Sequence, residues 1–157
     1  MDTVNEIREE TIEELNDLTK LMIDSFKGYK EAIDQSDDSF ALKNEFADRA
    51  ERRSVYIAEI QDYVRSLGGT PEVEGTARGA VHRNFMKFAN FFRDDEEGAV
   101  SSVENGEAYL AECIEDVLED DEVSAEAKQL LSKAHADVCA GRNFASNEED
   151  RRAFLQS

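Results

Sequence analysis

The stretch VNEIREETIEELNDLTKLMIDSFKGYKEAI, residues 4–33, decides the fold class. Its apolar residues recur in steps of three and four, the spacing that places side chains on one face of an α-helix. These positions are Val4, Ile7, Leu15, Leu18, Met22, Phe26, Tyr29 and Ile33. The pattern predicts one long amphipathic helix over about residues 4–34, whose apolar face must be covered by other helices.

A second helix is predicted over residues 39–67. The helical period resumes after a short polar turn and stops at Leu67-Gly68-Gly69-Thr70-Pro71. Glycine just past the last apolar residue, followed by proline, is typical of a helix end. Because the turn between the two helices is short, we expect them to pack as an antiparallel hairpin.

The second half of the chain repeats this arrangement. Helices are predicted over 96–118 and 124–145, separated by an acidic break, and they form a second antiparallel hairpin. The bundle domain is therefore assigned to residues 1–145. The remaining residues, 146–157, are charged and are expected to be a frayed or loosely docked tail.

The connection between the two hairpins determines their relative direction. It is far longer than a neighbouring pair of helices requires, and it contains a predicted helix over 76–92. A helix of this length spans about 25 Å, so the connection can run from one end of the bundle to the other. We therefore predict an all-α four-helix bundle with a long helical crossover, in which helices 39–67 and 96–118 run parallel.

Composition and net charge disfavour several classes of function. The 157-residue chain has a formal net charge of −19, which disfavours nucleic acids and anionic membranes because both attract basic surfaces. No apolar run is long enough to cross a membrane, and the N-terminus lacks the pattern of a signal peptide. With only two cysteines, the sequence predicts a cytoplasmic protein. The acidity suits cationic partners, metal ions or a saline habitat.

Several short blocks, in this order, resemble a known family. They are Leu15-Asn16-Asp17-Leu18, Asp24 with Gly28-Tyr29, Arg53 with Ile57-Ala58-Glu59-Ile60, Leu67-Gly68-Gly69-Thr70-Pro71, Gly79-Ala80-Val81-His82-Arg83 and Gly106-Glu107. Over residues 10–143 the chain resembles bacterial ferritin-like four-helix-bundle proteins of similar length that are classed as a domain of unknown function. The resemblance implies a ferritin-like fold and no settled activity.

Ionisable residues on or beside the apolar stripes are candidate ligands for iron or manganese. A di-iron centre in such a bundle uses carboxylates and imidazoles from facing helices. Counting residues from the two turns places most of the candidates at a similar level. The five candidates are Asp24, Glu51, Glu104, Glu107 and His135.

An alternative needs no metal. Neither of the helices expected to carry Glu-x-x-His contains it, so these residues cannot assemble a six-ligand redox centre. Arg53 lies close to the apolar stripe of its helix and is a possible ion-pair partner for Glu107 or Glu104. Catalysis is therefore uncertain, and the sequence favours a protein that is not an enzyme.

Two further groups of residues suggest interactions. The phenylalanines of the predicted crossover helix, Phe85, Phe88, Phe91 and Phe92, can close the bundle or form a homodimer face. Cys113 and Cys139 are too far apart along one hairpin for a disulfide, which leaves buried thiols, an intermolecular bridge or a redox sensor.

The leading hypothesis is a non-catalytic structural, interaction or stress-related module. The alternative is a metal-binding protein with a degenerate carboxylate and histidine site in the bundle core.

Overall fold

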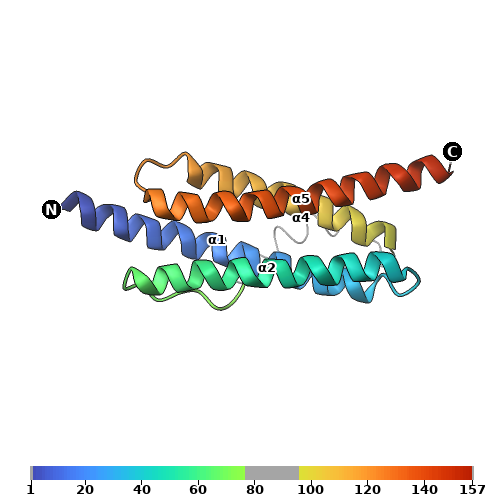
Figure 1. Ribbon diagram of the computed structural model, residues 1–157, viewed down its shortest axis with the longest axis horizontal. Helices are drawn as coiled ribbons and strands as arrows, with labels where there is room; N and C mark the ends of the chain where they lie inside the picture. Colours follow the sequence, from blue (N-terminus) through green and yellow to red (C-terminus); the bar gives the residue numbers. More distant parts are fainter. Residues whose placement is uncertain (1, 77–95, 157) are drawn as a thin grey trace.

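The computed structural model describes residues 2–76 and 96–156, and these residues form a bundle of four long helices (Figure 1). The helices are α1 (Asp2–Asp34), α2 (Phe40–Ser66), α4 (Glu96–Leu118) and α5 (Ala125–Gln156). They lie side by side along one axis, and no strand occurs in the described residues. The predicted fold class, an all-α four-helix bundle, is confirmed.

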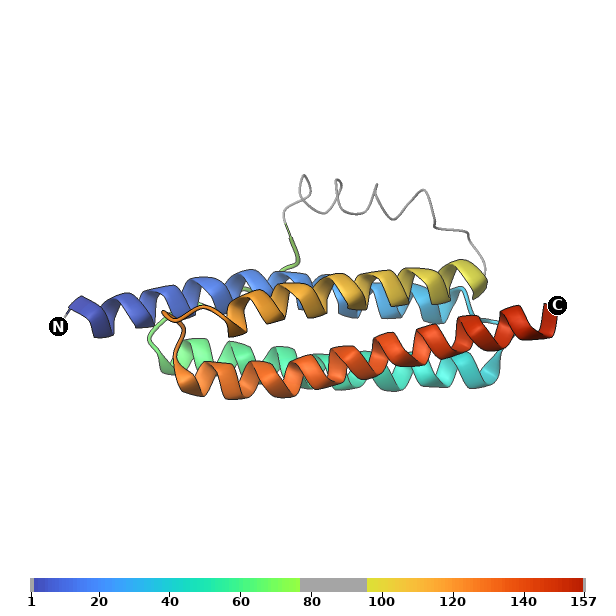
Figure 2. The same cartoon turned by 90° about the horizontal axis from the view of Figure 1, so that it is seen from above.

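The two predicted antiparallel hairpins are also confirmed. α1 packs against α2, and α4 packs against α5. α2 ends at the end of the bundle where the N-terminus lies, whereas α4 begins at the opposite end (Figures 1 and 2). α2 and α4 therefore run parallel, as the long connection predicted. Apart from Thr76, the helix predicted over 76–92 and its phenylalanine dimer face lie outside the described residues.

Each helix contributes a row of mainly buried residues three or four positions apart, which we call the seam. In α4 the seam is Val100, Val103, Glu107, Leu110, Ile114 and Val117. In α5 it is Ala127, Leu131, Ala134, Val138, Gly141 and Ala145. This spacing keeps one face of each helix turned toward its neighbours over the whole length of the bundle.

The buried apolar side chains form two clusters along the bundle axis. In α2, Ala50 and Ile57 belong to different clusters, and the seam residue between them is Arg53. In α4 the same division falls at Glu107. A polar layer thus separates the two apolar parts of the core.

Side-chain caps fix the helix ends. Ser39 accepts a hydrogen bond from the backbone N–H of Leu42 at the start of α2. Ser124 does the same for Ala127 at the start of α5, and its own N–H donates to Thr11 Oγ1 on α1. Gly68 follows α2 with a φ of 85°, a conformation that glycine adopts without strain. The turn before α5 is therefore attached directly to the first helix.

The chain that follows α2 lies along the first hairpin. Asn16 of α1 donates to the carbonyl of Thr70 and accepts from the N–H of Glu72, both at 3.0 Å. Gln61 of α2 donates to the carbonyl of Glu72 at 2.8 Å. These contacts attach the start of the connection to both helices of the first hairpin.

One predicted boundary must be corrected. α5 does not end at 145 but continues to Gln156, so the expected tail 146–157 is helical wherever the structure describes it. Its polar residues contact α4: Ser101 donates to Glu149 at 2.7 Å, and Arg152 donates to Glu96 at 3.0 Å. Because these contacts are polar, the apolar period of the sequence gave no sign of them.

None of the helices in the described ranges has the length and apolar character that crossing a bilayer requires.

Candidate functional site

The polar layer in the core is built around Arg53 of α2. Its side chain is 1% exposed, and it is the largest fully buried side chain in the described residues. The partner carboxylate is Glu107 of α4, which is 2% exposed. Both occupy seam positions, so the helical spacing that buries apolar neighbours also buries this charged pair.

Arg53 and Glu107 form a two-point ion pair. Nη1 donates to Glu107 Oε1 at 2.8 Å, and Nη2 donates to Oε2 at 2.6 Å. The remaining guanidinium contacts are with Asp137 of α5 and Ser25 of α1: Nε donates to Asp137 Oδ2 at 3.2 Å, and Nη1 donates to Ser25 Oγ at 2.7 Å. One side chain thereby contacts all three other helices.

Tyr29 of α1 completes the layer. Its hydroxyl donates to Glu107 Oε2 at 2.8 Å, and the Arg53 guanidinium lies 5.7 Å from the centre of its ring. Gly141 of α5 makes room for these groups, because a Cβ there would collide with both Glu107 Oε2 and the Tyr29 hydroxyl. A glycine is therefore required where α5 passes the ion pair.

Tyr29 and Arg53 both stay protonated near neutral pH. Burial and the negative charge of Glu107 raise the pKa of Tyr29 well above its ordinary value, so the phenol stays protonated. Burial opposes the charge of Arg53, but hydrogen bonds to Glu107 and its negative charge outweigh burial and raise the pKa of Arg53. Neither group can serve as a general acid or base near neutral pH.

The ion pair that the sequence suggested between Arg53 and Glu107 is present. A di-iron centre requires carboxylates whose oxygens face metal positions. Here both oxygens of Glu107 face a guanidinium. The residues at the centre of the bundle therefore do not fit such a centre.

The other predicted ligands lie apart from this layer. Asp24 is half-buried on α1 and accepts a hydrogen bond from Thr76 Oγ1 at 2.7 Å. Glu51 is exposed on α2. His135 is half-buried on α5 and contacts Glu115 of α4 through Nε2 at 3.0 Å. Within the described ranges, no three of the five candidates gather their ligand atoms in one place.

Glu104 pairs with another carboxyl group. A hydrogen bond to Glu149 of α5, partial burial and the negative charge of that residue raise the pKa of Glu104 to about 7. Arg142 opposes the shift, and Asp150 adds to it. The carboxyl groups of Glu104 and Glu149 therefore share one proton until the pH approaches neutrality.

The amino-acid sequence matches a family model. The model, "Domain of unknown function (DUF2383)", matches residues 10–120. The chain belongs to this family. The matched DUF2383 region contains Ser25, Tyr29, Arg53 and Glu107, whereas Asp137 and Gly141 follow it. No curated protein matches the chain.

Sequence reasoning missed three members of the layer in this DUF2383 chain. Asp137 follows Ala134 by three residues and precedes Gly141 by four, so the helical period alone could have placed it near the core. Ser25 and Gly141 carry no charge and gave no signal. Their roles depend on which residue of a distant helix lies opposite, and one sequence does not show that.

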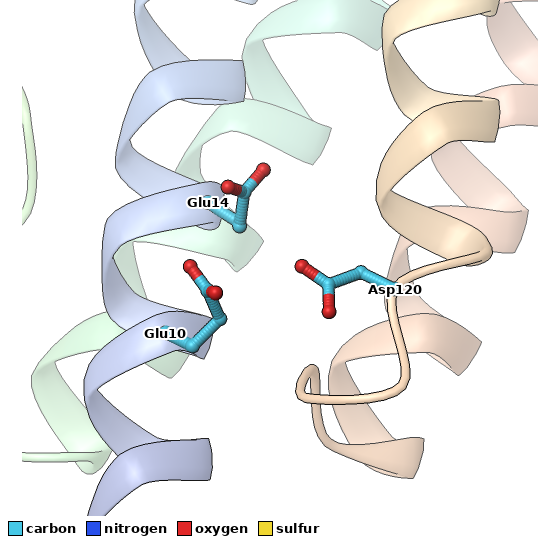
Figure 3. Close-up of side chains that lie close together, drawn as sticks. All are labelled: Glu10, Glu14 and Asp120. Atoms are coloured by element: carbon cyan, nitrogen blue, oxygen red, sulfur yellow. The ribbon is translucent and has the colours of Figure 1, made fainter.

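A separate acidic cluster lies where α4 meets the start of α1. Glu10 and Glu14 of α1 point toward Asp120 of the turn after α4, and their ligand oxygens lie within 4.8 Å of one another (Figure 3). Desolvation and the neighbouring carboxylates raise the pKa values of Glu10 and Glu14. All three residues are partly exposed, and exposed acidic groups of this kind occur commonly without a metal ion.

Proposed function

We propose that this protein is a non-catalytic structural or interaction module built on a ferritin-like bundle. The observation that supports the proposal is the two-point pairing of Arg53 with Glu107 at the centre of the core. Arg53 supplies a positive charge to both oxygens of Glu107, so this buried carboxylate needs no metal ion to neutralise it. The bundle then serves to hold its outer helix faces in a fixed arrangement.

The chemistry of the layer supports this assignment. Every group in it is already hydrogen-bonded, and the two central side chains are almost fully enclosed. A catalytic carboxylate needs access to substrate and a proton that it can exchange near working pH. The Arg53 and Glu107 pair offers no access to substrate, because both side chains are enclosed and each faces the other.

Metal analysis tests the proposal. Full-length protein purified without chelator should contain no stoichiometric iron or manganese that depends on Glu107. The Glu107→Gln variant keeps the shape of the side chain while removing its charge, so it should lose stability without losing metal. Urea denaturation and elemental analysis of the same samples measure both properties.

Iron or manganese bound in stoichiometric amounts, and lost in Glu107→Gln, would contradict the proposal. It would support the alternative function, a metal-binding protein that uses Asp24, Glu51, Glu104, Glu107 and His135. Glu51→Gln is the matched control, because Glu51 is exposed and lies outside the layer. Under the leading proposal this control changes neither metal content nor stability appreciably.

A further inference from the structure

Hydrogen bonds join the two hairpins at two levels of the described bundle. One level is the Arg53 layer, where the guanidinium pairs with two carboxylates of the second hairpin. The other is the end of the bundle at Ser124, whose N–H donates to Thr11 Oγ1 and whose hydroxyl lies 2.9 Å from the Tyr63 hydroxyl. The axial position of one hairpin against the other therefore depends on these two levels and on the apolar seam.

The apolar part of the seam distinguishes only weakly between one axial position and another. On α4 the seam residues seven positions before and after Glu107 are Val100 and Ile114, and both are fully buried. The seam of α5 consists of alanine, leucine and valine apart from Gly141. A displacement of the second hairpin by seven residues, about 10 Å along the axis, would therefore bring similar aliphatic side chains together again.

The Arg53 layer does distinguish these positions. After such a displacement the guanidinium would face Val100 or Ile114 in place of Glu107. A buried charge without a partner is strongly unfavourable, whereas a neutral hydrogen bond such as that of Ser124 makes a small net contribution because water can replace it. The charged layer is therefore the contact that penalises a displaced arrangement most.

Gly141 adds a steric condition at the same level. A Cβ at this place would collide with the Tyr29 hydroxyl of the first hairpin. A displacement by seven residues would bring Ala134 or Glu148 to this place, and both carry a Cβ. The hydroxyl of Tyr29 therefore fits against one point of α5, and that point coincides with the ion pair.

We propose that the Arg53 layer is a register lock, which fixes the axial position of the second hairpin against the first. The two-point ion pair with Glu107 defines the position, and Gly141 leaves room for it. The register lock rests on the proposed function, because a module that holds its outer helix faces in place needs one axial arrangement.

A distance between spin labels on the two hairpins measures the register. The labelled positions are Ala41→Cys on α2 and Gln129→Cys on α5, in a full-length chain that carries Cys113→Ala and Cys139→Ala. Both positions are exposed, and they lie near opposite ends of the bundle, so their separation is mainly axial. Double electron–electron resonance should give one narrow distance, which a displacement by seven residues would change by about 10 Å.

Removing the lock should broaden this distance. The combination of Arg53→Met, Glu107→Leu and Asp137→Ala removes all three charges, so none is left buried alone. Circular dichroism should show that its helices remain, and its label distances should spread at least twofold more widely or include a second population about 10 Å away. Arg53→Lys keeps one charge but cannot reproduce the planar two-point pair, so its distance should broaden to a smaller extent.

Leu131→Ala is the matched control. Leu131 is a fully buried seam residue outside the layer, so this variant loses stability through a cavity while the layer stays complete. Its label distance should stay as narrow as that of the parent chain. This control separates loss of register from loss of stability alone.

The register lock is wrong if the folded triple variant keeps the narrow distance of the parent chain. Should the triple variant fail to fold, the same result in Arg53→Lys decides against it, as does equal broadening in Leu131→Ala. Iron or manganese bound through Glu107 would overturn the proposed function by elemental analysis, whereas an unchanged label distance would overturn the register lock alone.

Discussion

At the scale of single residues, Arg53 defines the interior of this protein. Removing a guanidinium and a carboxylate from water is costly, and their mutual attraction compensates only when the geometry is good and the remaining hydrogen bonds are made. Here Glu107, Asp137 and Ser25 all accept from the guanidinium. Removing one partner of the pair should therefore cost more stability than replacing both partners with apolar side chains.

This reasoning predicts strong coupling between Arg53 and Glu107. Arg53→Met leaves the buried carboxylates of Glu107 and Asp137 without their guanidinium, and Glu107→Leu leaves the guanidinium with Asp137 alone. Each variant should cost about 3–5 kcal/mol of unfolding free energy. The double variant removes both charges of the pair and leaves only Asp137, at the edge of the layer, without its partner. It should therefore cost at least about 2 kcal/mol less than the sum of the two single variants. Urea denaturation of the four proteins measures the coupling.

The exposed pair of Arg52 with Asp48 on α2 is the matched control. Its side chains are separated by 3.4 Å and are 61% and 60% exposed, so solvent screens the interaction. The corresponding cycle should give a coupling below about 0.5 kcal/mol. Equal coupling in the two cycles would show that burial of the Arg53 layer has no energetic consequence.

Gly141 is the second residue with a specific prediction. Gly141→Ala should destabilise the protein by about 1–3 kcal/mol, because the new methyl group displaces Glu107 and Tyr29 from each other. Gly28→Ala on α1 should instead stabilise by about 0.5–1 kcal/mol, since nothing lies near a Cβ there and alanine favours helix. Thermal unfolding of both variants shows whether the two signs differ, and a stabilising Gly141→Ala would rule out the proposed role.

At the scale of helices, the part of α5 beyond Ala145 contacts α4 through polar side chains. Glu104 and Glu149 meet there, with Ser101, Arg142 and Asp150 beside them. The strength of such contacts depends on the protonation of the carboxyl groups, whereas the packing of the apolar seam residues does not. This part of the hairpin should therefore respond to pH before the rest of the bundle.

The pKa of Glu104 gives the direction of that response. The folded protein holds the proton up to about pH 7, whereas the unfolded chain releases it near 4.5. The folded state therefore binds more protons between these values, and stability falls as the pH rises through this range. Glu104→Gln should remove this dependence, with a gain near pH 8 of about 0.5 kcal/mol because solvent screens the partly exposed pair.

Urea midpoints at pH 5 and pH 8 measure the effect. Glu112→Gln is the control, because it removes the same charge from an exposed position of α4. The assignment of the shared proton would be contradicted if, between pH 5 and pH 8, the wild-type protein gained stability relative to Glu104→Gln.

At the scale of the whole molecule, the amino-acid sequence predicted the topology but only half of the site. Apolar periodicity and two short turns were sufficient for the hairpins, and the length of the connection was sufficient for the parallel arrangement of α2 and α4. Glu107 was recognised because a charge within an apolar stripe is conspicuous, and Arg53 was recognised as its possible partner. Asp137 was missed although its helical spacing from Ala134 and Gly141 pointed to the core. The extension of α5 was missed because its polar contacts with α4 leave no apolar period in the sequence.

The division of charge between the hairpins has one more consequence. The first hairpin contributes Arg53, and the second contributes Glu107 and Asp137. Two copies of the same hairpin would therefore oppose guanidinium to guanidinium, or carboxylate to carboxylate, in a dry interior. Like charges at that depth repel strongly. Pairing of two identical hairpins is thus disfavoured, whereas pairing of the first hairpin with the second neutralises the charges of both.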